Sequence, residues 1–465
     1  MNSSTNTRLE SQFHTDLRRL LYFFRDPKMV VVLGAQDHTS SNVKRMLWFC
    51  GLYGVASAIA LMGVFDSYLF MLSDSSNSAV GFAESISGLT QVLVVIPAGF
   101  IADRYSRSRI LGFCTALSVL YVFVSVQGIW ADDIRYIYAS LVLGGIYSAI
   151  QNSTSFALFS DSIPQGQRAM WMSRVAVITQ VSMGLGPLLS LGLFHYLGDH
   201  WKLPVLHAVL IVGFLLMVPA NLFLLGWTDI APVASPSVIS SDEPLVPRKK
   251  KTSVVPYLIC LNDVITCVGA GMTVKFFPLF FMNDYGFTPV QLQALFAIYC
   301  LVFAVFTWMC ERVAARIGRV QSSLIFSISG VACLFALAYV RSLPVVVIVF
   351  VLRGALQNSV YPIDRSIIMD FVPSDQRGRW NSIESISAMT WSGSAVIGGY
   401  LMDQHDYRYT FVITAWIYLV AVAMRVPLLW LVPRTEKFVT AKIINAHDEL
   451  LVRSPAASSP YLFAQ

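Results

Sequence analysis

One short motif occurs twice in this chain, first as Asp161-Ser-Ile-Pro164-Gln-Gly-Gln167-Arg168-Ala-Met-Trp171-Met-Ser173 and again, 209 residues later, as Asp370-Phe-Val-Pro373-Ser-Asp-Gln376-Arg377-Gly-Arg-Trp380-Asn-Ser382. Long apolar runs surround both copies. A duplication at this distance predicts one helical bundle built twice. In a membrane, two parallel halves are typical of carriers in which one half rocks against the other and exposes a central site to each side in turn.

The composition is that of a membrane protein. Charged residues make up 13% of the chain, against roughly 25% in ordinary soluble proteins, and the mean hydropathy is +0.62. A bilayer core about 30 Å thick is crossed by roughly 20 apolar residues in a helix. Twelve stretches qualify, at residues 46–72, 80–102, 110–130, 136–159, 175–197, 204–227, 254–282, 292–310, 322–340, 343–371, 383–401 and 410–431. We predict an all-α membrane protein with twelve transmembrane helices in two pseudo-symmetric six-helix bundles.

The basic residues predict the orientation. An even number of spans places both termini on one side, and Lys and Arg concentrate in cytosolic loops. Of the 33 Lys and Arg residues, 25 lie in the tails and the loops on that side, whereas the opposite loops hold four, Arg135, Lys202, Arg341 and Arg408. We therefore expect both termini in the cytosol, with the chain in a plasma membrane or endomembrane.

The same pattern divides the chain into five parts. The predicted domains are an N-terminal cytosolic tail (1–45), a first six-helix bundle (46–228), a cytosolic linker (229–253), a second six-helix bundle (254–432) and a C-terminal cytosolic tail (433–465).

A basic loop motif follows the second span. It reads Gly99-Phe-Ile-Ala-Asp103-Arg104-Tyr-Ser-Arg107-Ser-Arg109 and resembles the signature of the major facilitator superfamily, although Ser106 stands where the family usually has Gly. The resemblance extends over roughly residues 46–431. It implies a carrier fold in which Gly99, Asp103, Arg104 and Arg107 form a cytosolic gate. A plain loop of positive charge is the alternative.

The gate interpretation also has a physical basis. A glycine permits close approach of a neighbouring helix, and a carboxylate at a helix end can accept from arginines or from a helix N-terminus. The second half carries a weaker copy, Glu311-Arg-Val-Ala-Ala315-Arg316-Ile-Gly318-Arg319, with Ala315 in place of the acid. The repeated loops add two candidate gate pairs, Asp161 with Arg168 and Asp370 with Arg377, for which simple solvation is the alternative.

Several ionisable residues lie deep in the predicted spans. A charge at the bilayer centre costs about 2.5 to 3.5 kcal/mol on insertion scales, so it normally faces a partner or a water-filled cavity. The family resemblance implies that spans 1, 4, 7 and 10 line that cavity. The candidates on those spans for substrate binding or proton coupling are Asp66, Gln151, Asn152, Asp263, Lys275, Arg353, Asp364 and Arg365.

Depth sorts these charges into two layers. Counting about 1.5 Å per residue places Asp66, Lys275 and Arg353 in the outer half, and Asp263, Asp364 and Arg365 nearer the cytosol. Asp66 and Lys275 are separated by the repeat offset of 209 residues, so they occupy equivalent positions with opposite charge. We expect them to face each other across the cavity, where a carboxylate, a phosphate or a proton competes.

Alternatives remain for several of these residues. Asp66 and Lys275 would reach water at the outer surface if they snorkel, and Asp364 and Arg365 would reach the inner interface. Glu84 is expected at the outer surface, and Arg425 in span 12 is expected to pack structurally or snorkel.

These observations predict a secondary transporter that moves a small polar or anionic solute by alternating access, with protons as a candidate coupling ion because Asp66 can titrate when its basic partner is engaged elsewhere. Enzymatic activity is not expected, since neither a Gly-x-x-x-x-Gly-Lys loop nor a catalytic set of side chains occurs. No metal or cofactor is expected from seven cysteines without ligand spacing.

The alternative function is a transporter-like receptor or scaffold that binds a solute or partner without transport. Flux in proteoliposomes would separate the two. The expected partners are a small-molecule substrate, the lipid bilayer and protons, with no nucleic acid, and the protein is expected to be a monomer.

Overall fold

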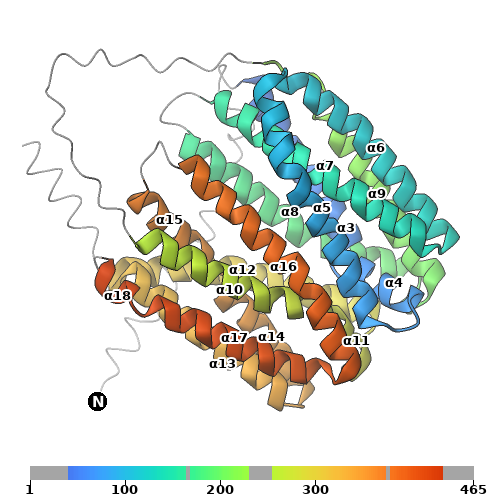
Figure 1. Ribbon diagram of the computed structural model, residues 1–465. Coiled ribbons are helices and arrows are strands. Elements are labelled where there is room, and N and C mark those ends of the chain that lie inside the picture. The colour runs from blue at the N-terminus through green and yellow to red at the C-terminus, as the bar shows by residue number, and fades with distance from the viewer. Residues whose placement is uncertain (1–39, 164–167, 230–253, 373–376, 433–465) are drawn as a thin grey trace, which may run out of the picture.

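The structure is a computed structural model that describes residues 40–163, 168–229, 254–372 and 377–432. These residues form helices and no strands (Figure 1). The helices are α3 (Ser41–Leu61), α4 (Val64–Leu72), α5 (Asn77–Arg104), α6 (Arg107–Ala131), α7 (Ile134–Asp161), α8 (Arg168–Leu197), α9 (Leu203–Leu222), α10 (Val255–Thr273), η2 (Val274–Phe276), α11 (Phe277–Tyr285), α12 (Pro289–Ile317), α13 (Arg319–Tyr339), α14 (Leu343–Asn358), α15 (Tyr361–Phe371), α16 (Arg377–Gln404), α17 (Tyr407–Arg425) and α18 (Leu428–Leu431).

Helical segments occupy all twelve predicted spans, which confirms the predicted fold class. Within the described ranges, ten segments are long and apolar enough to cross a membrane. The other two, α7 and α16, have 28 residues each and are more polar. In α7 the reason is the run Gln151-Asn-Ser-Thr-Ser155 near its middle. Polar residues in a helix of this length are expected where it faces protein or water rather than lipid.

Two sets of helices pack against each other. The first set comprises α3 to α9 and the second α10 to α18, and they meet along α5 with α16 and along α8 with α12. The short connections at residues 73–76, 132–133, 198–202, 286–288, 340–342 and 405–406 share one end of the molecule, which we call the sealed end. The opposite end, which includes Ser40, Tyr105, Asp229 and Val432, is called the tail end.

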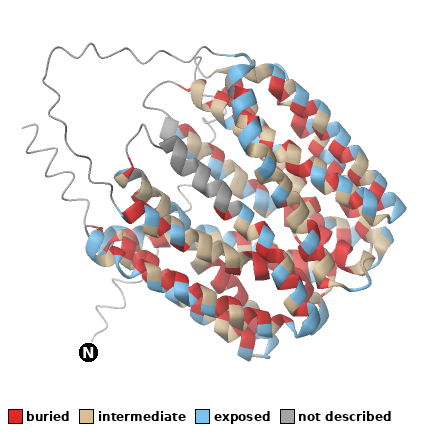
Figure 2. Cartoon of the chain, viewed as in Figure 1, coloured by how far each residue is buried: buried red, intermediate tan, exposed pale blue. Residues whose placement is uncertain are grey.

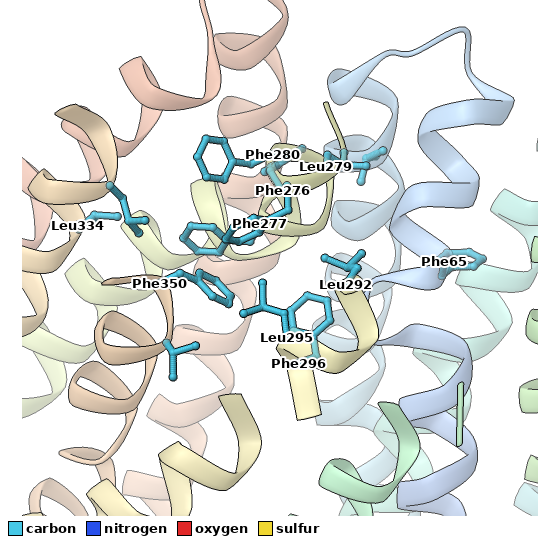
Figure 3. Packing of buried hydrophobic residues seen from close by; sticks show 14 of the residues in the cluster. Phe65, Phe276, Phe277, Leu279, Phe280, Leu292, Leu295, Phe296, Leu334 and Phe350 are labelled. Carbon is cyan, nitrogen blue, oxygen red and sulfur yellow. The ribbon is translucent and has the colours of Figure 1, made fainter. Parts of the chain in front are cut away.

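Burial follows the expected pattern for helices in a bilayer. Large apolar side chains such as Trp130, Tyr196 and Trp430 are exposed on the outside of the molecule, as the scattered pale blue surfaces in Figure 2 indicate. Inside the second set, Phe277 packs edge-on against Phe350 with ring centroids 4.9 Å apart (Figure 3). This aromatic cluster fixes α11 against α14 close to the charged residues described below.

Three predicted spans are interrupted rather than continuous. Span 1 breaks at Gly63, whose φ of 84° is readily adopted only by glycine. Span 7 passes through the 3-10 turn η2, and span 10 breaks between α14 and α15. Asp66 lies in the first turn of α4, Lys275 in η2 and Asp364 in the first turn of α15. Free backbone N–H groups at a helix start favour a carboxylate, so the breaks suit the two acids.

Candidate functional site

Three glycines, Gly81, Gly88 and Gly99, lie on one face of α5, and two of them show how closely the two halves approach each other. A Cβ at Gly81 would stand 2.3 Å from the carbonyl oxygen of Ala395, and one at Gly88 would stand 2.0 Å from Ser392 Cβ, both on α16. Gly99 lies on the same face three turns later, yet no described atom beyond its own helix lies within 4 Å of that position. The two helices therefore touch in the half of α5 nearest the sealed end. At the tail end the side chains of residues 377–386 of α16 lie outside the described part of the structure, and Figure 1 shows the two ribbons farther apart there than at the sealed end.

Asp403 at the end of α16 caps the start of α5. Its Oδ1 accepts hydrogen bonds from the backbone N–H of Asn77 at 2.8 Å and from the Asn77 side chain at 3.0 Å, and its Oδ2 accepts from the Ser78 N–H at 2.8 Å. Partial burial raises the pKa of Asp403, but the hydrogen bonds from Ser78 and Asn77 outweigh it, and the pKa lies below its usual value. A carboxylate of the second set thus accepts hydrogen bonds from the free backbone N–H groups at the N-terminus of a helix in the first set.

Asp199 makes the corresponding contact in the opposite direction. This residue follows α8 in the first set, and its Oδ1 accepts from the backbone N–H of Val290 at 2.9 Å, in the first turn of α12. Nearby, the Trp201 indole N–H donates to the Phe287 carbonyl at 2.6 Å. Because α5 and α12 form the second spans of their halves, the two caps are related by the internal repeat.

Lys275 joins the two halves just below these caps. Its Nζ lies 3.7 Å from Asp66 Oδ1 and 3.0 Å from Glu84 Oε2, so one ammonium from the second half serves two carboxylates of the first. It also lies 5.8 Å from the ring centroid of Trp391. The expectation that Glu84 reaches the outer surface is wrong, because its side chain is only 20% exposed and forms the shorter of the two contacts.

A second cluster of charges lies within the second half. Arg425 Nη2 lies 2.8 Å from Asp364 Oδ2, and Arg425 Nε donates to Asn262 Oδ1 at 2.8 Å. Ser323 Oγ donates to Asp364 Oδ1 at 3.2 Å. These contacts show that Asp364 is committed to a partner inside its own half, which favours a structural role for the pair.

The other candidates on the cavity-lining spans make contacts outside this cluster. Arg365 donates through Nε to Tyr361 Oη at 3.0 Å on its own helix. Gln151 is buried and donates to Ser155 Oγ at 2.9 Å, whereas the adjacent Asn152 is exposed. Asp263 is half-buried, one residue after Asn262. Within the described ranges, no group of three or more His, Cys, Asp or Glu side chains is arranged to hold a metal.

Arg353 lies inside the second half, against aromatic rings. It is 5% exposed, one Nη donates to Tyr418 Oη at 3.3 Å, and the Phe277 ring centroid is 4.8 Å from its guanidinium carbon. The following residue, Gly354, leaves room for Tyr299, since a Cβ there would stand 2.1 Å from that ring.

At the tail end, the repeated acids bind arginines of the basic motifs. Asp161 forms an ion pair with Arg107, and Asp370 Oδ2 lies 2.6 Å from Arg319 Nη2. Arg107 and Arg319 hold the same position in the two copies of the motif, so each half makes the same contact. The predicted partners Arg168 and Arg377, and also Asp103, have side chains outside the described part of the structure.

The serine that departs from the family motif also has a partner. Ser106 donates to a carboxylate oxygen of Asp229, which also accepts from the Ser108 backbone N–H at 2.9 Å and the Ser108 hydroxyl at 2.8 Å. Burial raises the pKa of Asp229, but these hydrogen bonds outweigh it and leave the pKa below its usual value. Asp229, seven residues after the end of α9 at Leu222, is therefore bound to the motif, and Arg104 is exposed.

Comparison with known proteins now identifies the family. The sequence profile of the Major Facilitator Superfamily matches residues 46–270 and 259–462. The chain belongs to the Major Facilitator Superfamily. Within this superfamily it is 27% identical over 241 residues to the inner membrane transport protein YajR of Escherichia coli (strain K12), in a match that covers 48% of this chain and 47% of YajR. The chain therefore matches about half the length of this curated relative.

Solved structures of superfamily members share the fold. A bacterial homologue of the human lysosomal transporter Spinster, inward-facing and occupied, gives a TM-score of 0.65 at 13% identity over 84% of this chain and 97% of that chain. A bacterial homologue of the iron transporter ferroportin gives 0.65 in its inward-facing state, at 13% identity over 84% of this chain and 99% of that chain. Its outward-facing state with soaked iron gives 0.55, at 14% identity over 83% and 98%.

Proposed function

We propose that this protein is a secondary active transporter that moves a small polar or anionic solute across a membrane by alternating access. The observation that carries the proposal is the contact of α5 with α16 at Gly81 and Gly88, near the sealed end, together with the wider separation of the two ribbons at the tail end in Figure 1. A carrier caught with one end closed has this geometry. The better superposition on inward-facing than on outward-facing relatives supports the same conformation.

The orientation completes this proposal. The excess of Lys and Arg at the tail end favours a cytosolic tail end with both termini in the cytosol, in a plasma membrane or endomembrane. The sealed end then faces outward, and the conformation is closed to the outside. We further propose that the protein works as a monomer, because each carrier of this design contains both halves in one chain.

Proton coupling follows from the charge balance at Lys275. In this conformation the Lys275 ammonium lies between Asp66 and Glu84. It also lies 5.8 Å from the ring centroid of Trp391 on α16. When the halves separate at this end, the first half keeps two carboxylates and the second keeps the ammonium. Neighbouring carboxylates without a cation favour binding of one proton, and the return of Lys275 displaces it. Each cycle would therefore carry a proton with the solute.

The other predicted residues take proposed roles around this mechanism. Arg353 is the proposed substrate contact, with Gln151, Asn152, Asp263 and Arg365 as further candidates on the cavity-lining spans. The proposed cytosolic gate consists of Gly99, Asp103, Arg104, Arg107, Asp161, Arg168, Asp370 and Arg377. Asp364 now has a better assignment as the partner of Arg425.

Proteoliposomes test the proposal directly. A thermal-stability screen first selects a solute that raises the melting temperature of the purified protein. Flux of that solute should then respond to an imposed pH gradient, and Asp66→Asn with Glu84→Gln should leave solute exchange intact while removing the response. Asp74→Asn, an exposed carboxylate at the same end, is the matched control. Binding without flux would favour the receptor alternative, and a surviving pH response in the double variant would exclude this coupling site.

A further inference from the structure

Among the residues that the structure describes, Arg353 is a buried cation without a carboxylate partner. Its only hydrogen bond among the described residues goes to Tyr418 Oη at 3.3 Å, and none of those residues accepts a hydrogen bond from its Nε. No carboxylate of the described side chains lies within the 4.0 Å that defines an ion pair. Most of the donors of this guanidinium are therefore unused.

Other cations in the same part of the molecule are neutralised. The pairs are Lys275 with Glu84 and Asp66, Arg425 with Asp364, and Arg408 with Asp284. A guanidinium does not escape the cost of burial by losing its proton, and a buried charge is tolerated when it is paired and hydrogen-bonded. Arg353 differs from these cations in having no counter-charge among the described side chains, which points to an anion that is not part of the protein.

The surroundings of Arg353 indicate what kind of anion fits. The ring centroid of Phe277 lies 4.8 Å from the guanidinium carbon and that of Tyr418 lies 6.0 Å away. Phe350 packs against Phe277, as Figure 3 shows. Aromatic faces attract a cation but carry no net charge to neutralise it. The rings of Phe277 and Tyr418 are each only 2% exposed in this conformation, so they offer apolar contact to the body of an organic molecule only after the helices move in the transport cycle.

We infer that Arg353 binds the anionic group of the transported solute, and that this solute is an organic monocarboxylate with an apolar or aromatic body. The inference rests on the proposed transport function and specifies its substrate class. The planar fork of arginine matches the two oxygens of a carboxylate, and the rings of Phe277 and Tyr418 pack beside the remainder. A small inorganic anion would satisfy the charge without using the rings.

Equilibrium binding tests the inference without requiring flux. Benzoate, benzamide and chloride are titrated separately into purified full-length protein, and the melting temperature is followed. Benzoate should raise it, whereas the neutral amide and chloride should not. Arg353→Gln should remove the benzoate response, and Arg353→Lys should bind about tenfold more weakly because a point charge loses the bidentate contact. Arg341→Gln, the same change at an exposed arginine, should behave as wild type.

Each outcome has one interpretation. An equal response to benzamide, or to chloride alone, would overturn the inference, as would an unchanged response in Arg353→Gln. If Arg353→Gln does not fold, the test uses Arg353→Lys instead, which should bind benzoate more weakly but measurably. Wild-type affinity of Arg353→Lys for benzoate would contradict the inference. Benzoate binding without any flux would keep Arg353 as a carboxylate-binding site and remove the transport proposal. Flux of an uncharged solute without carboxylate binding would support the transport proposal and overturn the inference about Arg353.

Discussion

Asp199 and Asp403 each cap a helix in the half of the molecule to which they do not belong. Asp403 binds the start of α5 from the end of α16, and Asp199 binds the start of α12 from the end of α8. Two other aspartates at the same end, Asp133 and Asp406, cap helices of their own half. The first pair of contacts exists only while the sealed end is closed, whereas the second pair survives its opening.

Removing the caps between the halves should therefore shift the conformational equilibrium. Replacing an N-cap side chain by alanine costs typically about 1 kcal/mol, so Asp199→Ala with Asp403→Ala should favour the outward-open state by about 2 kcal/mol, or roughly 30-fold. Reaction of a cysteine at Ser85 with an impermeant maleimide measures the opening. Asp133→Ala with Asp406→Ala is the matched control and should lower thermal stability without increasing labelling. Equal labelling in both double variants would contradict this role.

The caps should not act as an acid switch near neutral pH. The pKa of Asp403 is lowered by its hydrogen bonds in the closed state, so the cap stabilises that state above the usual aspartate pKa of about 3.9 and is lost only as the pH falls through the lowered value. Because maleimide reacts with the thiolate, labelling at Ser85→Cys is divided at each pH by labelling of a cysteine at the exposed position His200. In the Asp66→Asn, Glu84→Gln background, this relative labelling should be constant between about pH 5 and 8. A rise in labelling near pH 6 in that background would assign the pH response to the caps.

The pair of Asp364 and Arg425 should matter for stability. Breaking a buried pair by removing one partner costs about 3 to 5 kcal/mol, and these side chains are only 16% and 11% exposed. Asp364→Asn should lower the melting temperature strongly, and Asp364→Leu with Arg425→Met should recover part of the loss. Asp263→Asn is the control because it changes a carboxylate on the same side without an ion-pair contact among the described residues. A fully stable Asp364→Asn protein with impaired flux would instead assign Asp364 to the transport site.

The cytosolic gate gives an asymmetric prediction. Asp103→Asn should weaken the outward-open state, since a charge-assisted hydrogen bond contributes roughly 1.5 to 3 kcal/mol, and labelling of Asn152→Cys from the tail end should rise. Ala315→Asp in the second copy should change labelling much less. Asp370→Asn should also have a small effect, about 0.2 to 1 kcal/mol, because its side chain is 53% exposed. Identical labelling in wild type and Asp103→Asn would remove the gate role.

The sequence predicts the helices better than the contacts between them. Apolar runs of sufficient length gave all twelve spans, but hydropathy does not register the breaks at Gly63 and η2, because the residues around a break remain apolar. Glu84 was misplaced for a related reason. The position of Glu84 near the start of span 2 indicates its depth in the membrane but not the face of the helix on which it lies. That face determines its contact with Lys275.

Contacts between distant segments depend on the relative placement of whole helices. Asp199 and Asp403 lie in short loops or at helix ends, where an aspartate is common, and nothing local indicates that each reaches the other half. Arg425 and Asp364 were assigned separately because their helices are adjacent only after folding. The repeat offset of Asp66 and Lys275 is a long-range signal in the sequence, and it identifies two of the three residues in that cluster.

Alternating access itself is tested most directly by measuring the distance between the two halves at both ends of the molecule in one series of samples. Spin labels at His200 and Arg341 report the separation of the halves at the sealed end, and labels at Arg104 and Arg316 report it at the tail end, all four being exposed positions. Double electron–electron resonance on wild type and on Asp199→Ala with Asp403→Ala should show reciprocal changes, with the sealed-end distance lengthening as the tail-end distance shortens. Distances that lengthen together, or a sealed-end distance that is unchanged while the tail end moves, would contradict the account.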